Sequence, residues 1–264
     1  MGFRSFLSRV QGVFLPEQCR MCLLSSTKRC LATGALCEPC YLSLPGLQTH
    51  RCLQCAEPAL QSNSNVNNLP FVCATCQYWH PAFDATITCC DYAAPVNDWI
   101  AQLKYHNDSG MANVLACLVA YSLKSTAASI PNHRPIDVVI PAPISRQRLI
   151  TRGYNQAAIM ASTVAHHTQS RLVLGLINKP KETAAQATLQ ADHRADNLIS
   201  AFAVNRSHAQ FAAVAGAHVA IVDDVMTTGA TLEALAHLLK TQCGVARVTN
   251  LVFARTAPPI TLES

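Results

Sequence analysis

The stretch that decides the fold runs from Val219 to Leu232 and reads VAIVDDVMTTGATL. Its first four residues, 219–222, are apolar and predict a strand buried on both faces. Two carboxylates and a short polar loop follow, and apolar side chains from Leu232 onward then recur at helical spacing until Gly244. A strand, a loop and a helix in this order form half of a parallel α/β unit. The sequence therefore predicts an α/β fold built on a parallel sheet.

The polar loop of this unit has the composition of a phosphate-binding site, with the residues Thr227, Thr228, Gly229, Ala230 and Thr231. It follows the carboxyl end of the strand, where open α/β sheets bind ligands, and the N-terminus of the next helix attracts anions. Glycine allows close approach of the backbone, and threonine hydroxyls add hydrogen-bond donors. An ordinary capped turn is the alternative interpretation.

Asp223 and Asp224 lie directly before this loop. Ionised carboxylates only accept hydrogen bonds, so a pair of them suits the vicinal hydroxyls of a ribose. The pattern is neither GxxxxGK[ST] nor GxGxxG. It resembles the PRPP-binding signature of type I phosphoribosyltransferases, in which two acids and a Thr-Thr-Gly-x-Thr loop follow an apolar strand. We expect the ribose on the two acids and the 5-phosphate in the loop.

The N-terminal third carries four Cys-x-x-Cys pairs, which are Cys19/Cys22, Cys37/Cys40, Cys52/Cys55 and Cys73/Cys76. Two such turns complete a tetrahedral zinc shell, so four turns predict two closed, structural Zn²⁺ sites. A redox role is the alternative for a single pair. The spacing leaves sequential and interleaved pairing of the turns both open.

Composition sets limits on the class of protein. The chain has 264 residues, of which 50% are hydrophobic and 13% are charged, so we expect a packed core. No apolar run reaches the length of a membrane span, and the first residues lack the pattern of a signal peptide. We therefore expect a cytoplasmic protein with a cysteine-rich zinc-ribbon domain at 1–80 and a phosphoribosyltransferase-like domain at 81–264. The net charge of +5 is weak evidence for nucleic acid.

A second strand is predicted at Ile136–Ile140, and a basic segment follows it with Arg146, Arg148 and Arg152. We expect a loop here, because guanidinium groups bind phosphate oxygens two at a time and PRPP needs a site for its pyrophosphate. A solvated basic loop is the alternative. Further strands are predicted at Arg171–Ile177 and Val245–Ala254.

The polar, glycine-free segment after the third strand is a candidate lid that closes over the sugar. Its candidate residues are Lys179, Lys181, Gln186 and Arg194. A plain amphipathic hairpin or helix with a solvated face is the alternative.

The chain as a whole resembles the ComF family. The resemblance rests on the Cys-x-x-Cys pairs, LKY at 103–105, IPAPISRQRLITRGYNQ at 140–156, KETAAQ from 181, and VDDVMTTGAT at 222–231. It implies a zinc-ribbon head on a type I phosphoribosyltransferase fold, and it implies that Asn155 joins Arg152 on the pyrophosphate side. It also links the chain to DNA uptake in natural competence and to the use of DNA as a nutrient. Lys179 and Lys181 stand where the family often has arginine.

Three functional interpretations follow. The first, which we favour, is a phosphoribosyltransferase-like enzyme that displaces pyrophosphate from PRPP, with Mg²⁺ entering on the pyrophosphate and the acceptor unassigned. The second is a protein that binds single-stranded DNA and keeps the pocket for sensing PRPP or a nucleotide. The third is a zinc-ribbon adaptor for a competence helicase or another DNA-uptake protein.

Overall fold

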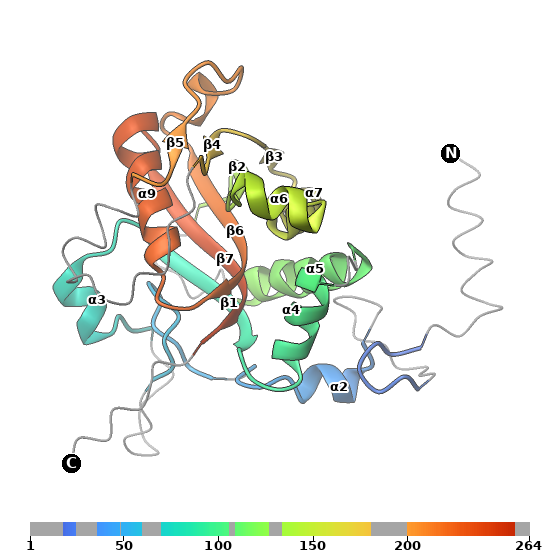
Figure 1. Ribbon diagram of the computed structural model, residues 1–264. Helices are drawn as coiled ribbons and strands as arrows, with labels where there is room; N and C mark the ends of the chain where they lie inside the picture. The colour runs from blue at the N-terminus through green and yellow to red at the C-terminus, as the bar shows by residue number, and fades with distance from the viewer. Residues whose placement is uncertain are drawn as a thin grey trace, which may run out of the picture.

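Figure 1 shows the computed structural model, in which helices flank both faces of a central sheet. The structure describes residues 18–24, 36–47, 49–59, 70–105, 109–126, 134–180 and 200–256. Among the predicted lid residues, Lys181, Gln186 and Arg194 lie outside these ranges. No helix in the described ranges combines the length and hydropathy that crossing a membrane would need.

The central sheet has five parallel strands in the order β1-β7-β6-β2-β3. Their bounds are β1 Ala85–Asp91, β2 Val138–Pro141, β3 Arg171–Leu172, β6 His218–Met226 and β7 Arg247–Arg255. The strand predicted at 219–222 lies in β6, which pairs with β2 on one side and β7 on the other. The prediction of a parallel α/β sheet is confirmed.

Helices α5 and α7 cover one face of this sheet and α9 covers the other. The described helices are α2 Glu38–Leu42, α3 Ala74–Trp79, α4 Val96–Tyr105, α5 Ser109–Thr126, α6 Arg146–Arg152, α7 Gln156–Thr168 and α9 Ala230–Cys243, with a 3₁₀ turn at Ala212–Val214. Helix α5 packs on β1 and β7, and α7 packs on β2 and β6, and these helices share one hydrophobic core with the sheet. The buried residues of α9 belong to a second hydrophobic core. Both faces of β6 are therefore covered, which explains its continuous apolar run.

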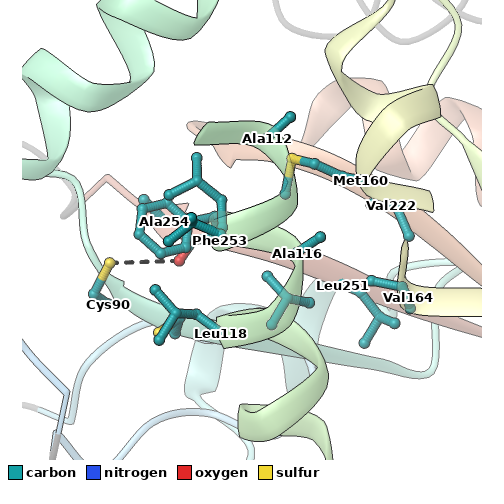
Figure 2. Close-up of a cluster of buried hydrophobic side chains, with 14 of the residues drawn as sticks. Cys90, Ala112, Ala116, Leu118, Met160, Val164, Val222, Leu251, Phe253 and Ala254 are labelled. Carbon is teal, nitrogen blue, oxygen red and sulfur yellow. Dashed lines mark hydrogen bonds between the residues drawn. The ribbon is translucent and has the colours of Figure 1, made fainter. Parts of the chain in front are cut away.

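Figure 2 shows the core under α5 and α7. Ala112, Ala116 and Leu118 of α5 meet Leu251 and Phe253 of β7 there. The small alanines let the helix approach the sheet closely, and the Phe253 ring, which is fully buried, fills the space beside them. The thiol of Cys90 donates to the carbonyl of Phe253 at 3.5 Å.

Two sequence predictions for this part of the fold are wrong. The strand expected at Arg171–Ile177 is two short strands, because the chain bends at Gly175, where φ is +75°. β3 stays in the main sheet, while β4, Ile177–Asn178, pairs antiparallel with β5, Ala203–Val204. The basic loop expected after β2 is largely a helix, α6.

The cysteine-rich segment contacts the sheet directly. The carbonyl of Leu53 accepts a hydrogen bond from the backbone N–H of Thr86 in β1 at 3.0 Å. Arg51 forms an ion pair of 2.6 Å with Asp91 at the end of the same strand. These contacts place the cysteine-rich segment against the edge strand β1.

Candidate functional site

A topological switch point lies between β2 and β6. After β6 the chain passes through α9 to β7 on one side, and after β2 it passes through α6 and α7 to β3 on the other side. Neighbouring parallel strands whose connections leave in opposite directions open a crevice at their carboxyl ends. The residues predicted to bind the ribose, the 5-phosphate and the pyrophosphate come from segments near this carboxyl edge of the sheet.

The two acids lie near the end of β6 rather than after it, because the strand continues to Met226. Their side chains alternate across the sheet. Asp224 is buried and forms an ion pair of 3.0 Å with the Nζ of Lys104. Asp223 is half-buried, and its Oδ1 accepts a hydrogen bond from the backbone N–H of Asp224 at 2.9 Å.

Burial, together with the negative charge of Asp224, raises the pKa of Asp223 to about 7. The positive charge of Lys104 opposes this rise in pKa. At neutral pH the carboxyl of Asp223 is therefore about half protonated, and it can be present as the acid or as the carboxylate. A carboxyl poised in this way is typical of functional sites.

Lys104 is a site residue that the sequence reasoning did not assign. It comes from the last turn of α4, far in sequence from the acids. The hydroxyl of Tyr154 donates to the carbonyl of Leu103, so the arginine-bearing segment and the lysine-bearing helix are joined. The LKY triplet at 103–105 could have indicated this lysine, because a charged side chain between two large side chains at a helix end is expected to point away from the core.

The loop after β6 has the geometry that its glycine requires. Gly229 adopts a left-handed conformation with φ +83° and caps the N-terminus of α9. A Cβ there would lie 2.5 Å from the Cε of Met226, so that methyl group would have to move, and the positive φ favours glycine in any case. The Oγ1 of Thr228 accepts from the N–H of Ala230 at 3.3 Å. Thr231, the first-turn residue of α9, reaches the pocket.

The basic segment is shaped by caps at both ends of α6. The Oγ of Ser145 accepts from the N–H of Arg148 at 3.3 Å, and Gly153 ends the helix with φ +77°. Asn155 then caps α7 by accepting from the N–H of Ala157 at 3.0 Å, and it donates to the carbonyl of Ala142 at 3.0 Å. The side-chain amide of Asn155 is thus bound to backbone groups and positions the segment.

These elements meet around one pocket of about 150 Å³. Its polar lining residues are Lys104, Ser145, Arg148, Arg152, Asn155, Gln156, Lys179, Asp223, Asp224 and Thr231. The pocket therefore combines the predicted ribose, phosphate and pyrophosphate residues with one residue of the predicted lid. Among the predicted residues that the structure describes, Arg146, Thr227, Thr228, Gly229 and Ala230 are not part of this lining.

Gln156 is a second pocket residue that the sequence reasoning did not assign. Its side chain is buried, with 3% of its surface exposed, and its Oε1 accepts no hydrogen bond from any described residue. A buried amide oxygen without a partner is costly unless a bound ligand or water satisfies it. In the sequence, Gln156 is the last residue of the RGYNQ motif, but the motif alone assigned no role to it.

The cysteines form two four-membered clusters, and the pairing is sequential: Cys19, Cys22, Cys37 and Cys40 in one, and Cys52, Cys55, Cys73 and Cys76 in the other. Within each cluster the sulfurs all lie within 4.8 Å of one another. Pairs of sulfurs are 3.9 Å and 3.7 Å apart in the two clusters. A tetrahedron with metal–sulfur bonds of about 2.3 Å places its sulfurs about 3.8 Å apart, so both clusters fit zinc.

Backbone groups support the thiolate form in both clusters. The N–H of Cys37 donates to the sulfur of Cys19 at 3.3 Å, and the N–H of Cys73 donates to that of Cys52 at 3.2 Å. A hydrogen bond with the thiol of Cys55 lowers the pKa of Cys52 to about 4 and raises the pKa of Cys55 itself. Zinc binds the thiolate form, so binding of the metal would release the thiol protons that remain in the cluster.

Comparison with known proteins agrees with this arrangement. A family model described as "Phosphoribosyl transferase domain" matches residues 152–257. "Competence protein F" of Haemophilus influenzae is 29% identical over 183 residues, covering 69% of this chain and 78% of that protein. "DNA utilization protein YhgH" of Escherichia coli O6:H1 is 30% identical over 240 residues, covering 89% of this chain and 97% of that protein.

The chain belongs to the ComF family. Among solved structures, this ComF family chain is similar to adenine phosphoribosyltransferase from Saccharomyces cerevisiae, with 18% identity and a TM-score of 0.34. That similarity covers 58% of this chain and 72% of the yeast chain. In the ComF chain, the family model spans the end of α6, both acids, the phosphate loop and β7.

Proposed function

We propose that the pocket at the β2–β6 switch point binds PRPP, with the ribose on Asp223 and Asp224. The observation that carries the proposal is that both acids, Thr231 and two arginines line the same pocket. Anionic side chains there would accept from the sugar hydroxyls, while Arg148 and Arg152 supply forked donors for a pyrophosphate. The 5-phosphate would bind at the N-terminus of α9, over the loop 227–231.

The reaction that this arrangement favours is displacement of pyrophosphate at C1 of the ribose. Positive charge develops on the sugar in such a reaction, and the carboxylates below it would stabilise that charge. Arg148 and Arg152 would stabilise the charge on the departing pyrophosphate. Mg²⁺, held mainly by phosphate oxygens and water, would neutralise part of the same charge when bound. Lys179 and the predicted lid residues Lys181, Gln186 and Arg194 would exclude water.

The structural role of zinc belongs to the same proposal. Each four-cysteine cluster would hold one Zn²⁺ with all four positions filled by sulfur, which leaves none open for water. The clusters lie within residues 19–76 and every strand of the main sheet lies within 85–255, which supports a division into domains 1–80 and 81–264.

PRPP binding is tested by thermal unfolding with and without PRPP and Mg²⁺. At about one hundred times the dissociation constant, PRPP stabilises the folded protein by about 2.7 kcal/mol, which raises the melting temperature by roughly 5–10 °C. We expect the Asp223→Asn and Asp224→Asn double variant to lose this shift. Asp98→Asn, at an exposed carboxylate of α4 outside the pocket, is the matched control and keeps it. An unchanged melting temperature of the wild type in the presence of PRPP and Mg²⁺ would contradict the proposal.

A second function, binding of single-stranded DNA, is favoured by a pair of exposed aromatic rings beside the second cysteine cluster. Tyr78 and Trp79 end α3 with 77% and 68% of their surfaces exposed, and their rings meet edge to face at 5.4 Å. Exposed aromatic rings stack with unpaired bases, and relatives of this chain are named for competence and DNA utilization. This function is compatible with a pocket that senses PRPP or a nucleotide, and with a competence helicase as partner.

The two tryptophans of the chain make this testable by fluorescence. Trp79 is exposed, whereas Trp99 is buried with 6% of its surface exposed. Stacking of a base on Trp79 quenches its emission, so oligothymidine should quench the wild type in a salt-dependent way and leave Trp79→Phe unquenched. Equal quenching in both proteins, or none in the wild type, rules out this surface as the DNA site.

A further inference from the structure

Arg255 connects the second cysteine cluster to the phosphate loop. It is the last residue of β7, and only 7% of its surface is exposed. Its Nε donates to the carbonyl of Cys55 at 3.2 Å. Its Nη1 donates to the carbonyl of Met226 at 3.2 Å and also to the carbonyl of Thr227. One buried guanidinium therefore joins a cysteine turn to the residues where the phosphate loop leaves β6.

The second cysteine cluster lies where Arg255 needs a counter-ion. Among the described residues, no carboxylate forms an ion pair with Arg255. Four thiolates around a bound Zn²⁺ would leave an excess of roughly two negative charges, so a loaded cluster would be the counter-ion that a buried guanidinium needs.

The other end of the contact sets the start of the loop. Thr227 and Thr228 are exposed, so few side-chain contacts fix their backbone. Gly229 lies directly against the side chain of Met226, whose Cε is 2.5 Å from where a Cβ would be. If the carbonyls of Met226 and Thr227 shift, the left-handed turn and the first N–H groups of α9 must shift with them. Anion binding at a helix N-terminus depends on the direction of those N–H groups.

We infer that Arg255 is a positioning residue through which the metal content of the second cysteine cluster sets the affinity of the pocket for a sugar phosphate. The inference rests on the proposed PRPP site. It gives the second metal site a role in ligand binding in addition to folding. It does not extend to the first cluster, whose described contacts include none to the phosphate loop.

A double-variant cycle tests the coupling, with PRPP and Mg²⁺ as the titrant in calorimetry. Arg255→Lys keeps the charge but cannot reach all the carbonyls that the guanidinium fork contacts, and Cys76→Ser removes one sulfur of the cluster. We expect each single variant to bind PRPP about tenfold more weakly, which corresponds to about 1.4 kcal/mol. The double variant should be no weaker than the weaker single variant, because both changes break the same connection.

Arg51→Lys is the matched control. Arg51 is a half-buried arginine beside this cluster, and it donates to the carbonyls of Ala56 and Gly46 and to Asp91. None of these groups belongs to the phosphate loop, so its variant should lose stability but keep wild-type affinity for PRPP. Wild-type affinity in Arg255→Lys, or a roughly hundredfold loss in the double variant, overturns the inference.

Hydrogen exchange without ligand separates the coupling from the proposed function. In Arg255→Lys and in Cys76→Ser, the amides of 227–231 should exchange faster while those of α7 keep their protection. If wild-type protein gives no heat with PRPP and these amides still respond, the coupling stands and the proposed ligand is wrong. If Arg255→Lys does not fold, Cys76→Ser decides, and unchanged protection at 227–231 overturns the coupling.

Discussion

Replacement of Asp223 by asparagine should make the protein more stable at alkaline pH than at acidic pH, relative to the wild type. The carboxyl of Asp223 has its pKa raised from 3.8 to about 7 by burial and by the charge of Asp224. A group whose pKa is higher in the folded state stabilises that state when protonated, and this stability is lost as pH rises through the folded pKa. Asparagine keeps the acceptor for the N–H of Asp224 and carries no charge at any pH.

The size of the effect follows from the two pKa values. A carboxyl with pKa 3.8 when unfolded and about 7 when folded contributes roughly 1 kcal/mol more stability at pH 6 than at pH 8.5. The free energy of unfolding of the wild type minus that of Asp223→Asn should fall by this amount as pH rises from 6 to 8.5. Because both proteins have the same cysteine clusters, the subtraction cancels any loss of metal at low pH.

Urea unfolding, monitored by circular dichroism at half-unit steps from pH 6 to 8.5, measures this difference in the free energy of unfolding. Asp98→Asn is the matched control, because it also removes one carboxylate, at an exposed position of α4 outside the pocket. A flat difference for Asp223→Asn would refute the reasoning, since Asp223 would then titrate normally. A difference of opposite sign would mean that Lys104 dominates the pair.

Three further predictions concern the metal, the turn and the lysine. Purified protein should contain two zinc ions per chain by atomic absorption, with one lost in Cys52→Ser and none lost in Cys89→Ser, a buried cysteine outside both clusters. Gly229→Ala should lose more stability to urea than Gly153→Ala, by up to about 1 kcal/mol, because both residues have positive φ but only the first has a neighbour, the methyl of Met226, that a Cβ would displace. Lys104→Met should move the pH midpoint of PRPP binding upward in calorimetry, since the lysine charge lowers the pKa of Asp223.

The sheet could be predicted from the sequence because its strands carry local signals. The apolar runs of β2, β6 and β7 have the length and composition of buried parallel strands, and Gly244 ends α9 as expected. β3 and β4 could not be separated, because the bend at Gly175 depends on tertiary pairing of β4 with β5. The helix α6 was missed because its caps, Ser145 and Gly153, are also common in loops.

The site was predictable where it is local and unpredictable where it is not. Asp223, Asp224 and Thr231 lie within nine residues of one another, and a single strand–loop–helix unit explains them. Lys104 reaches Asp224 only because α4 packs beside the sheet, so no spacing along the chain encodes the ion pair. The pairing of the cysteine turns has the same character, since only the folded backbone decides between sequential and interleaved clusters.

The position of the second cysteine cluster bears on why four-cysteine clusters and the candidate phosphate loop at 227–231 occur in one chain. Its residues Cys52, Cys55 and Cys76 share a buried core with Met226 and with α9, the two neighbours of the loop. A short glycine turn at a helix N-terminus has few contacts of its own, so its direction depends on what packs behind it. Here a metal-binding turn packs behind it, and Arg255 carries the hydrogen bonds between them. A metal cluster resists local deformation better than apolar side chains of equal size, because its four bonds fix both turns at once. Rigidity behind the loop is therefore the physical advantage that this arrangement offers to a pocket for phosphates.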